Sequence, residues 1–157
     1  MDAKVLTSEL INLLIKEQAH VSLEHSLEGL NPENRAKKPG EGLHSVWDEL
    51  EHIRITQEDI LQYMINPEWK SPSWPEGHWP ADTNQVSDEE WNKSVKQCIT
   101  DRDELVKIIK EKGADITDSI PHAKVHTYLR EMLIVAQHNS YHIAQIALIR
   151  KMLGNWR

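Results

Sequence analysis

The residues of this chain that are best placed for chemistry are two histidines, His138 and His142, in the segment Ala136–Trp156. They stand four residues apart in a run that favours a helix. Because each helical residue turns by about 100°, both imidazoles leave the same face of that helix, one above the other. Two side chains at this spacing can bind one metal ion. Gln145, seven residues after His138, falls on nearly the same line.

The neighbours of these histidines on the helix are apolar, among them Ile134, Val135 and Ile149. Ring nitrogens on a buried face must be coordinated or hydrogen-bonded, because an unpaired buried polar atom costs free energy. The spacing alone leaves two interpretations open: a metal site, or a pair of histidines that form hydrogen bonds within the core.

A catalytic metal site with one open position needs a third protein ligand. His52 is the natural candidate, because it lies in the middle of another predicted helix, beside the apolar side of that helix. Together with His138 and His142 it would form a set of three neutral imidazoles from two helices. Such a set suits zinc, nickel or iron(II), and the sequence does not choose among these metals.

Two other kinds of metal site fit the sequence less well. The zinc-protease motif H-E-x-x-H has a glutamate after its first histidine, where this chain has Asn139. A di-iron bundle needs two Glu-x-x-His motifs and two further glutamates. The pairs Glu17–His20 and Glu49–His52 have the required spacing, but the helix with the other two candidate ligands adds no carboxylate near them.

Most of the remaining histidines are not predicted to belong to a site. His20, His25 and His78 have no histidine three or four residues away that would share a helical face with them. His122 and His126 form a second pair at the i,i+4 spacing, but they follow a proline. We therefore expect them in a loop or a first helical turn.

Length and composition predict one domain, residues 1–157, and exclude nucleic-acid binding. A chain of 157 residues can bury a core without disulfides. The net charge of −7 and the absence of a long Lys/Arg run argue against a phosphate-binding surface. The single cysteine, Cys98, is expected to pack in the core of a cytoplasmic protein. We see no secretory signal and no apolar run of the ~20 residues that span a membrane.

The spacing of apolar residues predicts an all-α fold of four helices. One start is especially clear, because S-D-E-E at residues 87–90 forms a capping box. The connections are longer than those of a simple up-and-down bundle, so we expect at least one crossover connection. The four helices are predicted over Ala3–Glu28, Ser45–Ile65, Ser87–Gly113 and Thr127–Leu153.

The segment Asn66–Val86 contains four prolines and three tryptophans and has no periodic pattern. An irregular connection of this length is usually a lid, a binding loop or a disordered segment. Disordered segments are poor in aromatic residues, so the tryptophans argue against disorder. We predict an ordered flap packed across one end of the domain.

Five segments of the chain carry motifs whose spacing and local context can be compared with known families. They are His44-Ser45-x-Trp47 leading to Glu51-His52-Ile53-Arg54; Trp74-Pro75-Glu76-Gly77-x-Trp79-Pro80; Leu129-Arg130-Glu131; His138-Asn139-x-Tyr141-His142-x-x-Gln145; and Leu148-x-Arg150-x-x-Leu153-Gly154-x-Trp156. Together they resemble the DinB/YfiT-like superfamily of metal-binding proteins. The resemblance spans nearly the whole chain.

This resemblance implies a four-helix bundle with up-down-down-up connectivity and a long Trp/Pro-rich loop between its second and third helices. It also implies a homodimer and a divalent metal ion bound through His52, His138 and His142. Some relatives are thiol-dependent S-transferases or isomerases that use low-molecular-weight thiols, and many have no assigned activity.

Two functional hypotheses remain open. In the first, the protein is a metal-dependent transferase or hydrolase, in which the ion lowers the pKa of a bound thiol or water and makes a nucleophile. The nucleophile of thiol transfer would come from the cosubstrate, so no catalytic cysteine is needed. In the second, the protein is a non-catalytic dimeric stress or binding protein with a structural metal. An open coordination position favours the enzyme.

Overall fold

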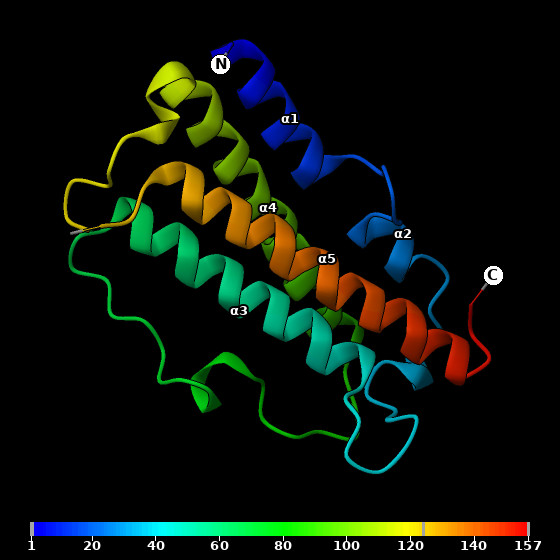
Figure 1. Cartoon of the computed structure of the whole chain (residues 1–157). Coiled ribbons are helices and arrows are strands. Elements are labelled where there is room, and N and C mark those ends of the chain that lie inside the picture. The colour runs from blue at the N-terminus through cyan, green and yellow to red at the C-terminus, as the bar shows by residue number, and fades with distance from the viewer. Residues whose placement is uncertain (1, 124, 157) are drawn as a thin grey trace.

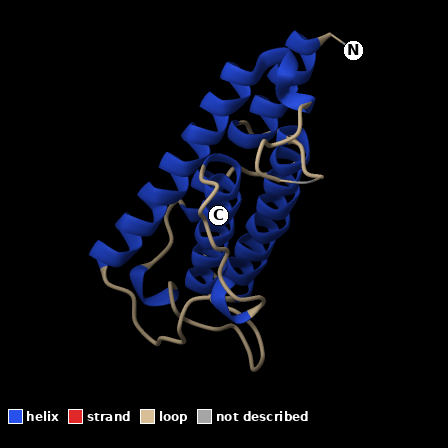
Figure 2. Ribbon diagram, turned by 90° about the vertical axis from the view of Figure 1, so that its left-hand side faces the viewer, coloured by secondary structure: helices blue, strands red, loops and turns tan. Residues whose placement is uncertain are grey.

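The computed structural model describes residues 2–123 and 125–156, and within them the extended structure is limited to one isolated bridge. Long helices packed lengthwise form the body of the molecule (Figures 1 and 2). The α-helices are α1 (Ala3–Ile15), α2 (Leu23–Leu27), α3 (Val46–Ile65), α4 (Asp88–Lys112) and α5 (Tyr128–Met152). Three short 3-10 helices lie in the connections: η1 (Pro32–Asn34), η2 (Glu76–His78) and η3 (Gly113–Thr117). The all-α prediction is confirmed.

Side-chain caps explain where the three longest helices begin. Ser45 accepts a hydrogen bond from the Asp48 backbone N–H at 3.1 Å, and the Asp48 carboxylate accepts one from Ser45 in return. Ser87 and Glu90 form the same capping box at the start of α4, as the sequence predicted. Thr127 caps α5. These caps satisfy N–H groups that have no partner within the helix.

The first predicted helix was wrong in length, because the chain leaves the helix after Ile15. Lys16, Glu17 and Gln18 follow, and Glu17 makes local hydrogen bonds where the helix could have continued. Its carboxylate accepts hydrogen bonds from the Ser22 backbone N–H at 3.1 Å and from His25 Nδ1 at 2.6 Å. Ser22 then caps the short helix α2. Such local side-chain bonds compete with helical hydrogen bonds.

The core has two clusters, one toward each end of the bundle. One joins α1 to the end of α4 and the start of α5, and Leu105, Ile109 and Met132 are completely buried in it. The other joins the starts of α3 and α4 to the end of α5 and contains Cys98, which is 1% exposed. The packing role predicted for this cysteine is confirmed. No helix in the described part of the chain is long and apolar enough to cross a membrane.

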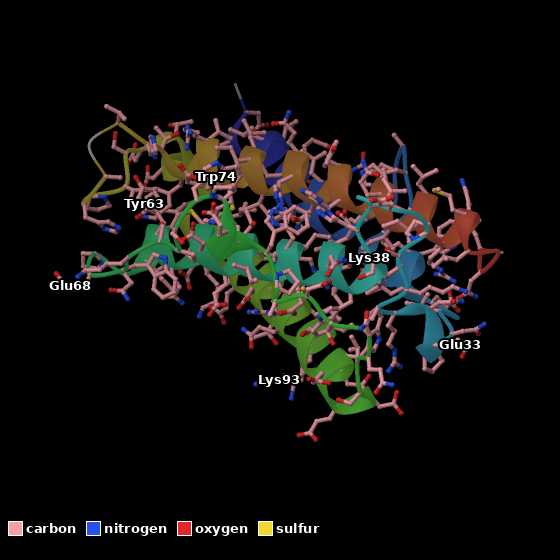
Figure 3. The ribbon with its side chains drawn as sticks, turned by 90° about the horizontal axis from the view of Figure 1, so that it is seen from below. Glu33, Lys38, Tyr63, Glu68, Trp74 and Lys93 are labelled. Carbon is pink, nitrogen blue, oxygen red and sulfur yellow. The ribbon has the colours of Figure 1, made fainter. Side chains whose placement is uncertain are left out.

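The segment between α3 and α4, which we call the flap (residues 66–86), runs back along the bundle (Figure 1). Figure 3 looks onto the face that the flap crosses, with Trp74 of the flap labelled. Asp59 of α3 ties the flap down, because it accepts hydrogen bonds from Trp69 Nε1 at 2.7 Å and from His78 Nε2 at 3.3 Å. An ion pair of 2.7 Å between Lys38 and Asp82 joins the flap to the loop before α3.

Candidate metal centre

Three histidine side chains meet between α3 and α5. His52 comes from the first half of α3, and His138 and His142 lie one turn apart on α5. One nitrogen from each ring can be chosen so that all three lie within 4.8 Å of one another. The Nε2 atoms of His52 and His138 are 3.0 Å apart. The structure therefore brings together the three residues that the sequence predicted as ligands.

Hydrogen bonds fix which nitrogen carries the proton in two of these rings. Nδ1 of His52 donates to the backbone carbonyl of His78 at 2.7 Å, since a carbonyl oxygen can only accept. Nδ1 of His142 donates to Glu49 Oε2 at 2.6 Å. In both neutral rings Nε2 then carries a lone pair. Metal-binding histidines typically use their second nitrogen in this way.

The surroundings of His52 and His138 favour the uncharged form of these two imidazoles. Burial lowers the pKa of His52, whose side chain lies in the interior. Burial, followed by repulsion from His142 and His52 in their charged forms, lowers the pKa of His138 to about 4. Both rings are therefore neutral at pH 7, and each has a lone pair that it can offer to a metal ion.

A divalent ion fits this set of donors better than hydrogen bonding alone. A proton on Nε2 of His138 could be donated to His52, but the buried Nδ1 of His138, which has no partner among the described residues, would then stay unsatisfied. A proton on Nδ1 instead would leave two lone pairs facing each other at 3.0 Å. A cation between these lone pairs removes their repulsion. Ligand nitrogens of a tetrahedral zinc ion lie about 3.3 Å apart, which small side-chain rotations can reach from here.

The flap holds His52 from two directions. The carbonyl of His78 accepts the proton of its Nδ1, and the indole of Trp79 lies parallel on the imidazole, with ring centroids 3.9 Å apart and planes at 4°. Because Asp59 ties the flap to α3, the orientation of His52 depends on how the flap docks.

Glu49 connects a candidate ligand to a histidine outside the cluster. Its Oε2 accepts from His142, and its Oε1 accepts from Nδ1 of His44 at 3.0 Å. Glu49 is buried on α3, almost one turn before His52, whereas His44 is exposed. The carboxylate therefore fixes the ring of His142 from below the surface and links it to a side chain that reaches solvent.

A cavity of about 250 Å³ opens beside His142. Gln145, which the sequence placed on the same face as the two α5 histidines, lines this cavity. The described residues give its amide no hydrogen-bond partner. The cavity is therefore the place where a small molecule can approach the cluster from the side of His142.

The other histidines take no part in the cluster through their side chains. His20 contacts Ser140, and His25 pairs with Glu17. His122 and His126 both contact Tyr63, at the far end of α3. The Glu-x-x-His pairs of a di-iron site do not form, because Glu17 binds His25 and Glu49 binds His142.

Sequence reasoning missed two groups that orient the ligands. On sequence grounds, Glu49 is assigned only to the Glu-x-x-His spacing of a di-iron site, although its place three residues before His52 is a usable signal. His78 was set aside because its side chain has no helical partner, and this remains correct for the side chain. Its backbone carbonyl, however, holds His52, and a carbonyl has no signature in the sequence.

A helical bundle that gathers three imidazoles beside a small cavity defines a class, namely an all-α protein with a candidate mononuclear metal centre. The family model of the DinB superfamily matches residues 16–146, a range that contains all three histidines. The chain therefore belongs to the DinB superfamily. A search of curated proteins and a search of solved structures found no match.

Proposed function

We propose that this protein binds one divalent metal ion through His52, His138 and His142 and uses it to activate a thiol or a water molecule. The reaction would be a thiol-dependent S-transfer or a hydrolysis. The ion, which is zinc, nickel or iron(II) in this proposal, supplies a Lewis acid that lowers the pKa of the bound nucleophile.

The observation that carries this proposal is the arrangement of the three rings beside an open cavity. Two of the rings have their Nδ1 protons fixed by the His78 carbonyl and the Glu49 carboxylate, so their Nε2 lone pairs are available. Among the described residues, the cluster of possible ligands contains three side chains. Three protein ligands leave a coordination position for water or substrate, as in catalytic zinc sites.

The chain's own residues have distinct parts in this proposal. Glu49 and the His78 carbonyl orient the ligand rings. Trp79 covers one face of His52 and excludes water from it. Gln145 offers an unengaged amide to the molecule that enters the cavity.

We also propose that the helices α1, α3, α4 and α5 are connected in the up-down-down-up order. Trp47 near the start of α3 lies against Trp91 near the start of α4, with ring centroids 6.4 Å apart, which supports a parallel pair of helices. Tyr63 near the end of α3 contacts His126 just before α5 at 3.0 Å, which supports an antiparallel pair. A long flap connection is what a parallel α3–α4 pair requires.

We also propose one domain over residues 1–157, a homodimer, and a cytoplasmic protein that uses a low-molecular-weight thiol and a small-molecule substrate. Large apolar side chains that are exposed on α1 and α5, namely Val5, Leu13 and Leu133, support the dimer. The acidic net charge supports the exclusion of nucleic acid as a partner.

The alternative is a non-catalytic dimeric stress or binding protein whose metal is structural. One observation favours it: the indole of Trp79 covers His52 closely and contacts the ring of His142 edge-on, with centroids 6.1 Å apart. A centre that is covered in this way could hold an ion without exchanging a ligand. The two functions differ in whether an added thiol reaches the ion.

Metal analysis of purified, metal-loaded protein tests the ligand assignment. We expect one equivalent of metal in the wild type and a large loss of bound metal in His52→Ala and in His138→Ala. His122→Ala, which removes a histidine outside the cluster, is the matched control and should retain the metal. Full stoichiometry in both cluster variants would overturn the assignment.

Thiol-transfer and hydrolysis assays on the loaded protein then test catalysis. Turnover that depends on the metal and is lost in His52→Ala supports the enzyme. A loaded protein that retains its ion, shows no turnover and does not change its metal spectrum when thiol is added supports the structural alternative.

A further inference from the structure

We infer that the cavity beside His142 selects an uncharged, largely apolar small molecule and discriminates against anionic ones. This inference rests on the proposed function, because the bound molecule would be the substrate of the metal centre. It adds the chemical class of that substrate, which neither the family nor the three histidines determine.

The walls of the cavity are mainly apolar. Large apolar and aromatic side chains from the loop before α3, from the flap and from α5 line it: Leu43, Trp79, Tyr141, Leu148, Ile149 and Met152. Several of them are unusually exposed for their type, with Leu148 at 51% and Met152 at 53%. An apolar ligand would cover this surface and be stabilised by the removal of apolar area from water.

The charges around the cavity disfavour an anion. Its lining in the described residues contains the Glu49 carboxylate and neither lysine nor arginine. Lys38, in the loop beside the cavity, pairs with Asp82, and Lys151 of α5 lies over the ring of Trp156. In the metal-free protein, a carboxylate or phosphate on the ligand would therefore lose its hydration near Glu49 without gaining a cationic partner from the lining.

The size of the cavity and its free polar group further limit which ligands it can hold. A volume of about 250 Å³ exceeds the roughly 150 Å³ of an apolar protein cavity that holds one benzene ring. This is room for one ring with a short substituent. Gln145 lies almost one turn beyond His142 and offers its unengaged amide to one uncharged polar group of the ligand.

A matched pair of probes tests this selection. Benzyl mercaptan and 4-(mercaptomethyl)benzoate share the ring and the thiol and differ in one carboxylate. Their binding is measured by titration while the methyl NMR signals of Leu148 and Met152 are followed, in metal-free and in cobalt-loaded protein. We expect the neutral probe to bind at least tenfold more tightly in the metal-free form. Affinities within twofold of each other, or tighter binding of the carboxylate, would overturn the inference.

Charge substitutions at the rim test whether the lining causes the preference. Leu148→Arg adds a cation to the lining, so it should reduce the preference for the neutral probe to less than threefold. Leu148→Gln adds polarity without charge and should keep the preference. Thr100→Arg, which places the same charge at an exposed position of α4 outside the cavity, should keep it as well. If Leu148→Arg does not fold, Met152→Lys provides the same test, and an unchanged preference in the folded variant contradicts the inference.

Different measurements test the proposed function and this inference, so one can be wrong while the other is right. If the cobalt-loaded protein shows no thiolate absorption band with 2-mercaptoethanol, activation of a thiol by the metal is wrong, while the metal-free titration still reports on the cavity. If neither probe moves the two methyl signals, the cavity does not select the proposed class. The same holds if these signals move only on dilution, because a second copy of the chain then occupies this face.

Discussion

Glu49 is the residue whose position says most about the candidate centre. If the carboxylate of Glu49 accepted a hydrogen bond only from the exposed His44, the two residues would form an ordinary ion pair near the surface. The carboxylate also accepts from Nδ1 of His142, and at the shorter of the two distances, 2.6 Å against 3.0 Å. A carboxylate partner of this kind makes an imidazole a better electron donor and holds its ring in one orientation.

Replacement of Glu49 by glutamine should weaken metal binding by about ten- to a hundredfold, as the loss of such orienting partners typically does. The amide cannot accept hydrogen bonds from both histidines through oxygen, because one end now carries N–H groups. Competition with a coloured chelator measures the affinity. Glu51→Gln is the control, because Glu51 is also buried on α3 but pairs with Arg54. Equal losses in the two variants would show that Glu49 has no special part in binding.

From the lowered pKa of His138 we can predict how the free energy of unfolding of the metal-free protein depends on pH. Its pKa is about 4 in the folded chain against an ordinary 6.5, with burial as the main cause. Below pH 6.5 the unfolded chain takes up a proton there that the folded chain does not, so the free energy of unfolding falls as the pH is lowered toward 4. His138→Gln cannot take up this proton and should show a weaker fall.

Urea unfolding at pH 7, 5.5 and 4.5 in the presence of a chelator measures this difference. The difference between the variant and the wild type isolates His138 from the carboxylates that titrate in the same range. His20→Gln, at an exposed site, should follow the wild type. A variant that loses as much stability as the wild type over this range would contradict the pKa of His138.

Among the structural elements, the flap is the one whose contacts orient the ring of His52 toward the candidate centre. Gly77 makes the tight packing of the flap possible, since a Cβ at this position would lie 2.8 Å from Pro72 Cβ and 3.2 Å from Ser73 Oγ. These two residues precede η2, and the His78 carbonyl that holds His52 comes directly after Gly77. Any displacement here moves the hydrogen-bond partner of a candidate ligand.

We expect Gly77→Ala to loosen the flap and to lower metal affinity, while the helices stay folded. Amide hydrogen exchange should become faster over residues 66–86 and stay unchanged in α4. Gly40→Ala is the matched control, because a Cβ there makes an ordinary contact of 3.4 Å with Leu43. Unchanged exchange and affinity in Gly77→Ala would show that the flap accommodates the methyl group and does not control His52.

The elements also show which parts of the fold the sequence could predict. The starts of α3, α4 and α5 were predictable because capping side chains within a few residues determine them. The end of α1 was missed because no proline or glycine marks it, and the bonds that Glu17 makes depend on the geometry of the turn. The three histidines were predictable from helical spacing and family resemblance, whereas the contacts of His78 and Trp79 depend on how the flap docks.

At the scale of the whole molecule, the burial of Cys98 excludes the protein's own thiol from the proposed chemistry. It lies in the core between α3 and α4, and burial raises its pKa to about 12. A thiol of this kind is not ionised at neutral pH and does not act as a nucleophile. The thiol in the proposed reaction must therefore come from a second molecule.

Labelling of Cys98 should consequently report unfolding of the bundle. We expect a chromogenic disulfide reagent at pH 8 to react far more slowly with the native protein than with the protein in denaturant. The reaction should appear in the same range of denaturant as the loss of helical circular dichroism. Fast labelling of the native protein would mean that the core around Cys98 opens without global unfolding.

X-ray absorption at the metal edge of the loaded protein shows whether three histidines bind one metal ion and leave a coordination position open. We expect three imidazole nitrogens and one further light ligand, and we expect sulfur to replace that ligand when a small thiol is added. Fewer than three imidazoles, or a fourth protein ligand that thiol does not displace, would contradict this expectation.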